Sequence, residues 1–154
     1  MATVKTNYID DQKHPALLRL FETEGFSHLN EENLDAFLAK EGLKLAIFAD
    51  NPNDRKTTLD IAVIAPELKK AFEGTLVETA WADFKVARSL AARWGLRSMP
   101  SVAIFIDDVF WGAVQGLKTW EDYCRLIPEI LLQEKPAPRT IAVLNKDASG
   151  GCEE

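Results

Sequence analysis

Residues 91–116 constrain the fold more than any other part of the sequence, which there reads AARWGLRSMPSVAIFIDDVFWGAVQG. Apolar residues at helical spacing end at Gly95, which supplies the left-handed residue that ends many helices. A short loop leads to Pro100. Residues 101–106 then form an apolar, partly β-branched run that is typical of a buried strand. The stretch therefore predicts a helix, a tight loop and a core strand in direct succession.

The same stretch predicts a β-hairpin. Asp107 and Asp108 suit a two-residue turn, and residues 109–115 are expected to return as an antiparallel strand that ends at Gly116. A helix, an X-Pro loop, a buried strand and a hairpin in this order resemble the second half of a thioredoxin fold.

Two prolines belong to this resemblance to thioredoxins. The first implies a cis peptide bond between Met99 and Pro100, the alternative being an ordinary trans proline at the start of a strand. The second, Pro66, lies inside a long helix predicted from an N-cap at Thr58 through Phe72. Proline removes a backbone donor and should kink this helix. Thioredoxins carry an I-A-P or similar triplet in the same helix.

The dithiol motif of thioredoxin-like oxidoreductases is missing from its expected place. By the resemblance the motif falls on residues 58–61, which read T-L-D-I. Thiol–disulfide exchange requires a thiolate, and the hydroxyl of Thr58 cannot replace it. Peroxiredoxin-like chemistry fails for the same reason, so the sequence disfavours dithiol redox activity.

The rest of the chain completes an α/β, thioredoxin-like fold: a central mixed sheet of four to five strands flanked by helices, with an extra N-terminal helix. Helices are predicted over 14–24, from an N-cap at Asn30 to Gly42, from 83 or 84 to 94, and from Thr119 onward with a kink at Pro128. Strand patterns cover 26–29, 43–50 and 75–81. We expect a flexible N-terminal segment (1–13), one domain (14–133), and a linker and tail (134–154), in which the apolar run 140–144 could add an edge strand or dock on the body.

Composition and charge exclude several classes of function. The net charge is −6, which disfavours a nucleic-acid partner. The N-terminus has no apolar segment of a signal peptide, and no run reaches the ~20 apolar residues of a membrane span. The two cysteines lie far apart, which suits a reducing cytosol and a cytoplasmic protein.

The remaining reactive side chains do not assemble a catalytic or metal site. Cys124 is expected to be a small buried hydrophobe of the last helix, and Cys152 a free thiol in the tail. His14 and His28 have no carboxylate or cysteine at ligand spacing. We therefore predict no catalytic residue, no metal and no cofactor.

A thioredoxin scaffold without thiols still has a peptide groove, in which main-chain groups beside the cis proline pair with an extended ligand. Its expected walls are the former active-site turn, the loop before the hairpin and the end of the second hairpin strand: Thr58, Leu59, Asp60, Arg97, Ser98, Met99, Pro100, Gln115 and Gly116. Met99 could adapt to varied ligand side chains. For each residue taken alone, a purely structural role is an equal alternative.

The missing cysteines, together with P-S-V-A-I-F and F-W-G-A-V-Q-G, resemble the HyaE/HupG/HoxO family of hydrogenase-expression proteins. This resemblance implies a non-catalytic chaperone that matures a nickel–iron uptake hydrogenase. Its partners would be the small-subunit precursor, including its twin-arginine signal peptide, and other maturation proteins. The iron–sulfur clusters would belong to that client, because this chain lacks the cysteines to hold one.

An acidic chaperone suits a basic signal peptide. The carboxylates that could contact it are Asp60, Asp107, Asp108, Glu121 and Asp122, although for any one of them ordinary solvated charge is the favoured explanation. Two alternatives remain: a thiol-disulfide oxidoreductase-like enzyme working through Cys124 or Cys152, and a generic peptide-binding adaptor.

Overall fold

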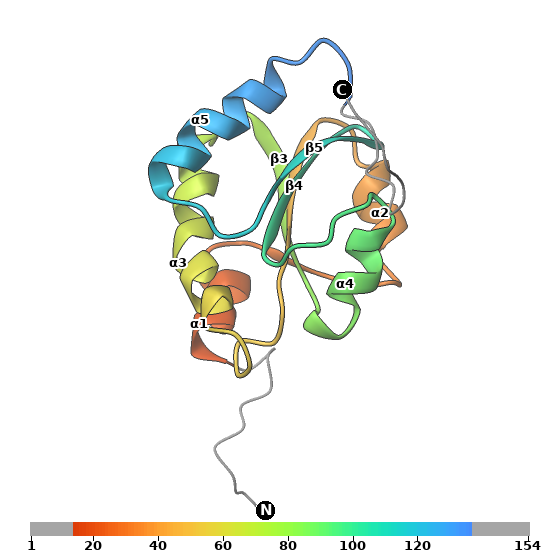
Figure 1. Ribbon diagram of the computed structural model, residues 1–154. Helices are drawn as coiled ribbons and strands as arrows, with labels where there is room; N and C mark the ends of the chain where they lie inside the picture. Colours follow the sequence, from red (N-terminus) through yellow and green to blue (C-terminus); the bar gives the residue numbers. More distant parts are fainter. Residues whose placement is uncertain (1–13, 137–154) are drawn as a thin grey trace, which may run out of the picture.

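The computed structural model describes residues 14–136, which form a five-stranded sheet between two layers of helices (Figure 1). The strand order is β1-β3-β2-β4-β5; β1, β3 and β2 are parallel, and β4 and β5 are antiparallel to their neighbours. The strands are β1 (Ser27–Leu29), β2 (Leu43–Phe48), β3 (Leu76–Ala82), β4 (Ser101–Ile106) and β5 (Val109–Gln115). This is the predicted α/β, thioredoxin-like arrangement. The segment 1–13, residues 140–144 and Cys152 lie outside the described residues.

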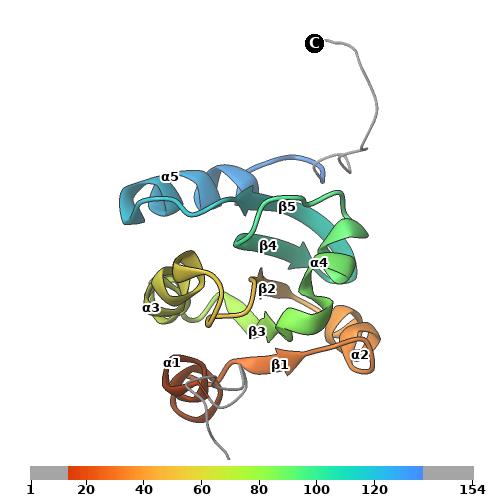
Figure 2. The same ribbon diagram turned by 60° about the horizontal axis from the view of Figure 1, so that its bottom comes forward.

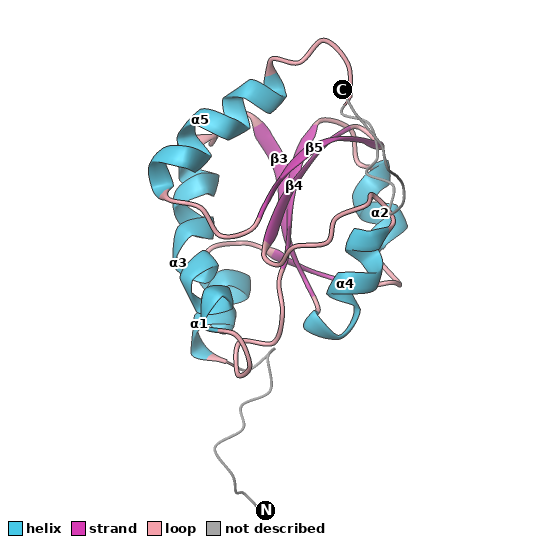
Figure 3. Cartoon of the chain, viewed as in Figure 1, coloured by secondary structure: helices cyan, strands magenta, loops and turns pink. Residues whose placement is uncertain are grey.

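The helices cover both faces of the sheet (Figure 2). One face carries α1 (Pro15–Leu18) with the π-helical turn that continues it (Arg19–Thr23), α3 (Lys56–Ala71) and α5 (Trp120–Leu131). The other face carries α2 (Leu34–Ala39) and α4 (Phe84–Ala92). Side chains alternate between the faces along each strand, so the sheet separates two apolar cores. The colouring by element in Figure 3 shows the same sandwich.

The β4–β5 hairpin has the bounds that the sequence predicts. Residues 101–105 are buried, as expected for a strand with neighbours on both sides, and Asp107 turns the chain with a φ of +56°. Its side-chain Oδ1 accepts a hydrogen bond from the N–H of Gly42 at 2.9 Å. The turn is thus tied to the start of β2 as well as to its own strands.

The second helix begins later than predicted. Its N-cap is Asn33, whereas Asn30 caps the preceding turn: its Oδ1 accepts from the N–H groups of Glu32 and Asn33 at 2.9 and 3.0 Å. The side chain of Asn33 in turn donates to the carbonyl of His28 at 2.7 Å. The polar residues after β1 therefore form a turn before the helix starts, because a side-chain oxygen competes for the same N–H groups.

Two further expectations are wrong. Thr58 does not cap α3, since the N-cap is Arg55 and Thr58 lies in the first turn. Cys124 is exposed rather than buried, because Tyr123 and Ile127 form the inward face of α5. The helix predicted from Thr119 onward does begin there: Thr119 caps α5, and its side chain accepts from the N–H of Asp122 at 3.1 Å. Among the described residues, no helix is both long and apolar enough to cross a membrane.

Candidate peptide-binding surface

The loops that the sequence singles out meet at one edge of the sheet. Phe48, the last residue of β2, pairs with Ser101, the first of β4, and Ser101 also pairs with Gln115 at the end of β5. The loop after β2, the loop before β4 and the end of β5 are consequently neighbours, although they come from three distant parts of the chain.

The loop before β4 is held by hydrogen bonds from outside it. The Met99–Pro100 peptide bond is cis. The Oε1 atom of Gln115 accepts from the backbone N–H of Arg97 at 2.9 Å and from that of Ser98 at 3.3 Å. The hydroxyl of Ser101 donates to the carbonyl of Ser98.

The remaining contacts of the loop leave one residue unpaired. The N–H of Leu96 donates to Ala91 at 3.1 Å, and the carbonyl of Pro100 accepts from Gly116 at 2.8 Å. The N–H and carbonyl of Met99 have no partner within the part of the chain that the structure describes. The Met99 side chain packs into the core between the sheet and α2 and α4, and the residue is only 8% exposed. Met99 therefore has main-chain groups to offer a partner, while its side chain is committed to the core.

The start of α3, where a dithiol motif would lie, carries no sulfur. Thr58 is buried, and its hydroxyl donates to the carbonyl of Asp50 at 3.0 Å, so it anchors the preceding loop instead of lining a groove. Ile61 is also buried in the core. Of the predicted wall residues in this turn, Leu59 is half-buried and Asp60 is exposed, which leaves these two to face a partner.

Sequence reasoning missed the ion pairs that organise the loop after β2. Arg88 of α4 donates to both carboxylate oxygens of Asp50, at 2.9 and 2.8 Å, and Arg55 approaches the same carboxylate at 3.8 Å. The side chain of Asn51 accepts from the N–H of Asn53 at 2.8 Å. The turn formers N-P-N-D gave a signal for the loop, but no local signal identifies Arg88 as the partner of Asp50.

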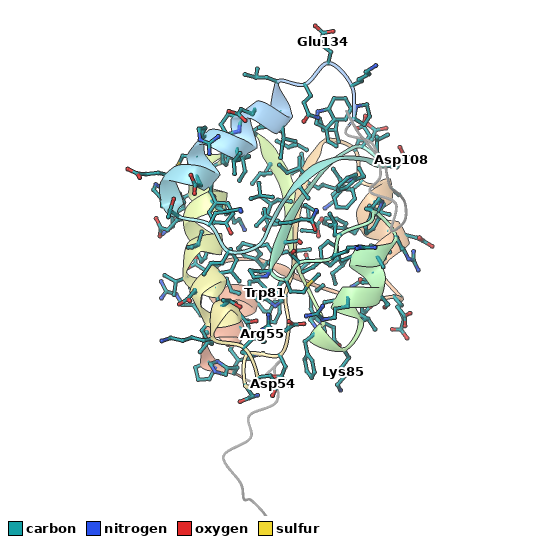
Figure 4. The ribbon with its side chains drawn as sticks, viewed as in Figure 1. Asp54, Arg55, Trp81, Lys85, Asp108 and Glu134 are labelled. Carbon is teal, nitrogen blue, oxygen red and sulfur yellow. The ribbon has the colours of Figure 1, made fainter. Side chains whose placement is uncertain are left out.

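The predicted acidic contacts do not form one patch. Asp107 and Asp108 lie on the hairpin turn, at the opposite end of β4 from Pro100. Figure 4 accordingly places Asp108 far from the loop that contains Asp54 and Arg55. Glu121 and Asp122 belong to the first turn of α5, which follows Gly116 closely in the chain, and Asp122 pairs with Arg125 at 3.4 Å.

A groove of about 320 Å³ extends from this surface between β5 and α5. Gln115 is one of its lining residues, and Leu126 and Ile130 of α5 provide apolar lining. Leu117, in the connection to α5, and Trp120, the first residue of α5, are 36% and 41% exposed, which is unusual for such large apolar side chains. The end of β5 thus combines an unpartnered sheet edge among the described strands with nearby apolar surface.

His28 has a carboxylate neighbour that its sequence spacing did not reveal. Its Nε2 lies 3.7 Å from Oδ2 of Asp83, and the ring packs edge-on against Phe21. Over residues 14–136, no three histidine, cysteine or acidic side chains gather in a way that could hold a metal ion.

Comparisons with known proteins place the whole domain in one family. The family described as Hydrogenase-1 expression protein HyaE has a model that matches residues 16–123. Hydrogenase expression/formation protein HoxO of Azotobacter vinelandii is 32% identical over 135 residues, covering 88% of this chain and 90% of the relative. HoxO of Cupriavidus necator is 26% identical over 145 residues (92% and 90%), and HupG of Rhizobium leguminosarum bv. viciae is 30% identical over 116 residues (70% and 74%).

Proposed function

The chain belongs to the HyaE family of hydrogenase expression proteins and has a role in hydrogenase maturation, and we propose that it acts there as a non-catalytic chaperone. Its client is the small-subunit precursor of a nickel–iron uptake hydrogenase, and its ligand on that client is the extended twin-arginine signal peptide. The protein works in the cytoplasm, before the precursor is exported, and other maturation proteins are its further partners.

The observation that carries this proposal is the unpaired main chain of Met99. Its neighbours Arg97, Ser98 and Pro100 are all bonded within the chain, whereas its own N–H and carbonyl are not. A main-chain N–H and C=O that stand side by side without partners can bind an extended segment as a short strand. An unfolded signal peptide is such a segment, and the pairing requires no particular side chain at that position.

Electrostatics favour a basic ligand. The chain carries a net charge of −6, and Asp60 is exposed near the start of α3. Complementary charge mainly increases the rate at which a partner is captured and the selectivity among partners. A peptide with two adjacent arginines combines an extended backbone with a charge opposite to the net charge of the chain.

The direct test is binding of the full-length chain to three forms of the client, measured by co-purification and by titration calorimetry. These are the precursor, the precursor with its arginine pair replaced by glutamine, and the mature subunit without the signal. We expect the precursor to bind most tightly and the other two to bind at least about tenfold more weakly, the loss of about 1.4 kcal/mol that a few charge-assisted contacts supply. Equal binding of all three forms would refute recognition of the signal peptide, and binding of none would refute the chaperone.

A matched pair of variants places the ligand on the surface. Asp60→Asn removes an exposed carboxylate near the start of α3, and Asp108→Asn removes another exposed one, on the hairpin turn at the far end of β4. We expect only Asp60→Asn to weaken binding, by a few-fold, and to reduce its salt dependence. Equal effects would show that net charge, rather than this surface, attracts the client.

The alternative, a thiol-disulfide oxidoreductase, has one observation in its favour, the exposed thiol of Cys124. The chain nevertheless has no second cysteine within residues 14–136 to form a disulfide with it. Insulin reduction by the wild-type chain that is abolished in Cys124→Ser would replace the chaperone proposal by this enzyme.

A further inference from the structure

A single side-chain atom holds two consecutive backbone N–H groups of the loop. The Oε1 of Gln115 lies 2.9 Å from the nitrogen of Arg97 and 3.3 Å from that of Ser98. Gln115 is the last residue of β5, and its backbone is fixed by pairing with Ser101. The acceptor is therefore attached to the rigid sheet, while its two donors belong to a loop without regular secondary structure.

The loop depends on this acceptor because few other contacts reach it. Arg97 and Ser98 are exposed, so their side chains contribute no burial that would fix the backbone. The hydroxyl of Ser101, a fully buried residue, donates a hydrogen bond to the carbonyl of Ser98. Gln115 from one side and Ser101 from the other thus determine the direction in which the peptide planes before Met99 point.

We propose that Gln115 is a positioning residue of the peptide site. It does not itself bind the client; it orients residues 97–98 so that the N–H and carbonyl of Met99 face outward, in the geometry of a strand edge. The inference rests on the proposed function, because it assigns a role within the same surface. It also assigns the ligand chemistry: the client pairs through its main chain, so the client residue opposite Met99 cannot be proline.

Two substitutions separate the acceptor from the shape of the side chain. Gln115→Leu keeps a similar volume without an acceptor, and Gln115→Glu keeps an oxygen at the same distance from the backbone. Gln133→Leu is the matched control, since the amide of Gln133 also contacts β5, at the carbonyl of Trp111 with a distance of 3.2 Å, but lies outside the loop.

Amide hydrogen exchange measured by NMR on the full chain reports the geometry, and titration with a synthetic twin-arginine signal peptide reports the function. In Gln115→Leu we expect the amides of Arg97 and Ser98 to exchange at least about tenfold faster and the peptide affinity to fall about tenfold, the effect of losing two modest hydrogen bonds. Gln115→Glu should restore both readouts, and Gln133→Leu should leave the exchange of both amides unchanged. A series of signal peptides, each with proline at a different position, should include one position at which proline lowers the affinity for the wild-type chain.

The outcomes are distinct. Unchanged exchange in Gln115→Leu would refute the role of its side chain in the loop. Faster exchange with unchanged peptide affinity would refute positioning while leaving the chaperone proposal standing. A wild-type chain that binds no signal peptide would overturn both. If Gln115→Leu fails to fold, Gln115→Asn, which withdraws the acceptor by one methylene, replaces it in the same two measurements.

Discussion

Lys44 is a buried lysine in the middle strand of the sheet, and replacing it by methionine tests how the fold is closed at the end opposite the peptide site. The residue is fully buried, and its ammonium group donates to three backbone carbonyls: that of Leu38 at 2.7 Å, and those of Lys40 and Asp107. The first two end α2, and the third belongs to the β4–β5 turn. One side chain therefore ties a helix end to a hairpin turn.

The expected loss of stability follows from the three backbone carbonyls that methionine cannot hydrogen-bond. Three acceptors lose their donor, and a buried acceptor without a partner costs about 1–3 kcal/mol. Two terms reduce the total: Lys40 and Asp107 are exposed residues whose carbonyls water can reach, and the variant no longer buries an ammonium group. We expect Lys44→Met to lower the free energy of unfolding by about 2–4 kcal/mol, which for a chain of this length lowers Tm by about 5–15 °C.

Urea denaturation followed by circular dichroism measures the effect. Lys70→Met is the matched control, because Lys70 is exposed and, within residues 14–136, forms an ion pair only with Glu67, at 3.6 Å on the same helix. Such exposed pairs contribute about 0–1 kcal/mol. A loss in Lys44→Met no larger than that in Lys70→Met would refute the reasoning, since it would mean that water satisfies all three carbonyls.

The stability difference between the wild type and Lys44→Met is also expected to depend on pH, and the sign follows from the pKa of Lys44. Burial lowers the pKa of Lys44 below 10.5, although the carboxylates of Asp107, Asp108 and Glu78 oppose the shift. The unfolded chain then holds this proton more tightly than the folded chain does. The stability due to the lowered pKa is fully present above pH 10.5 and is lost as the pH falls through the native pKa. The stability difference between the wild type and Lys44→Met should therefore widen as the pH approaches 10.5.

Two further predictions concern the packing around the sheet. Burial raises the pKa of Glu78, but hydrogen bonds from Lys40 and Ser27, both at 2.6 Å, outweigh it and lower the pKa below 4.5. Glu78→Gln should therefore lower the free energy of unfolding by about 1 kcal/mol at pH 7. The urea midpoints of the variant and the wild type should converge as the pH falls through the lowered pKa of Glu78. A constant difference between the two midpoints down to pH 3 would contradict this. Gly112→Ala would place a Cβ 2.8 Å from Cγ2 of Ile130, so we expect a loss of about 1–3 kcal/mol. The loss should be smaller in an Ile130→Ala background, and equal losses in both backgrounds would exclude this clash as the cause.

Local signals in the sequence predict the fold well where one short segment decides the structure. The hairpin bounds follow from a β-branched run and a turn, and the start of α5 follows from Thr119, whose side chain reaches an N–H group three residues away. The prediction fails at Asn30 for a related reason: the same side chain suits a helix cap and a turn, and only the position of Asn33 decides between them.

The face of a helix is harder to predict than its extent. The sequence predicts a last helix that starts at Thr119 and buries Cys124, and the start of α5 is right. Only Tyr123 and Ile127 are buried, while Trp120 is 41% exposed and Cys124 is exposed. Each helical residue turns the side-chain direction by ~100°, so neighbours in sequence can face the core and the solvent. A short helix with apolar residues on several sides leaves this rotation to tertiary packing.

In the candidate site, too, the sequence identifies residues more readily than their contacts. The sequence identifies Gln115 and Met99 as members of one surface, because a resemblance places both beside Pro100. It cannot identify their roles, because these depend on bonds between residues 17 or 18 positions apart. Met99 is available to a partner only because Gln115, Ser101 and Gly116 take up the groups on either side of it. The groups of this loop that can bind a client are therefore those that the fold itself does not bond. A substitution at a residue that does not contact the client is expected to change the binding affinity, because it changes which groups are bonded.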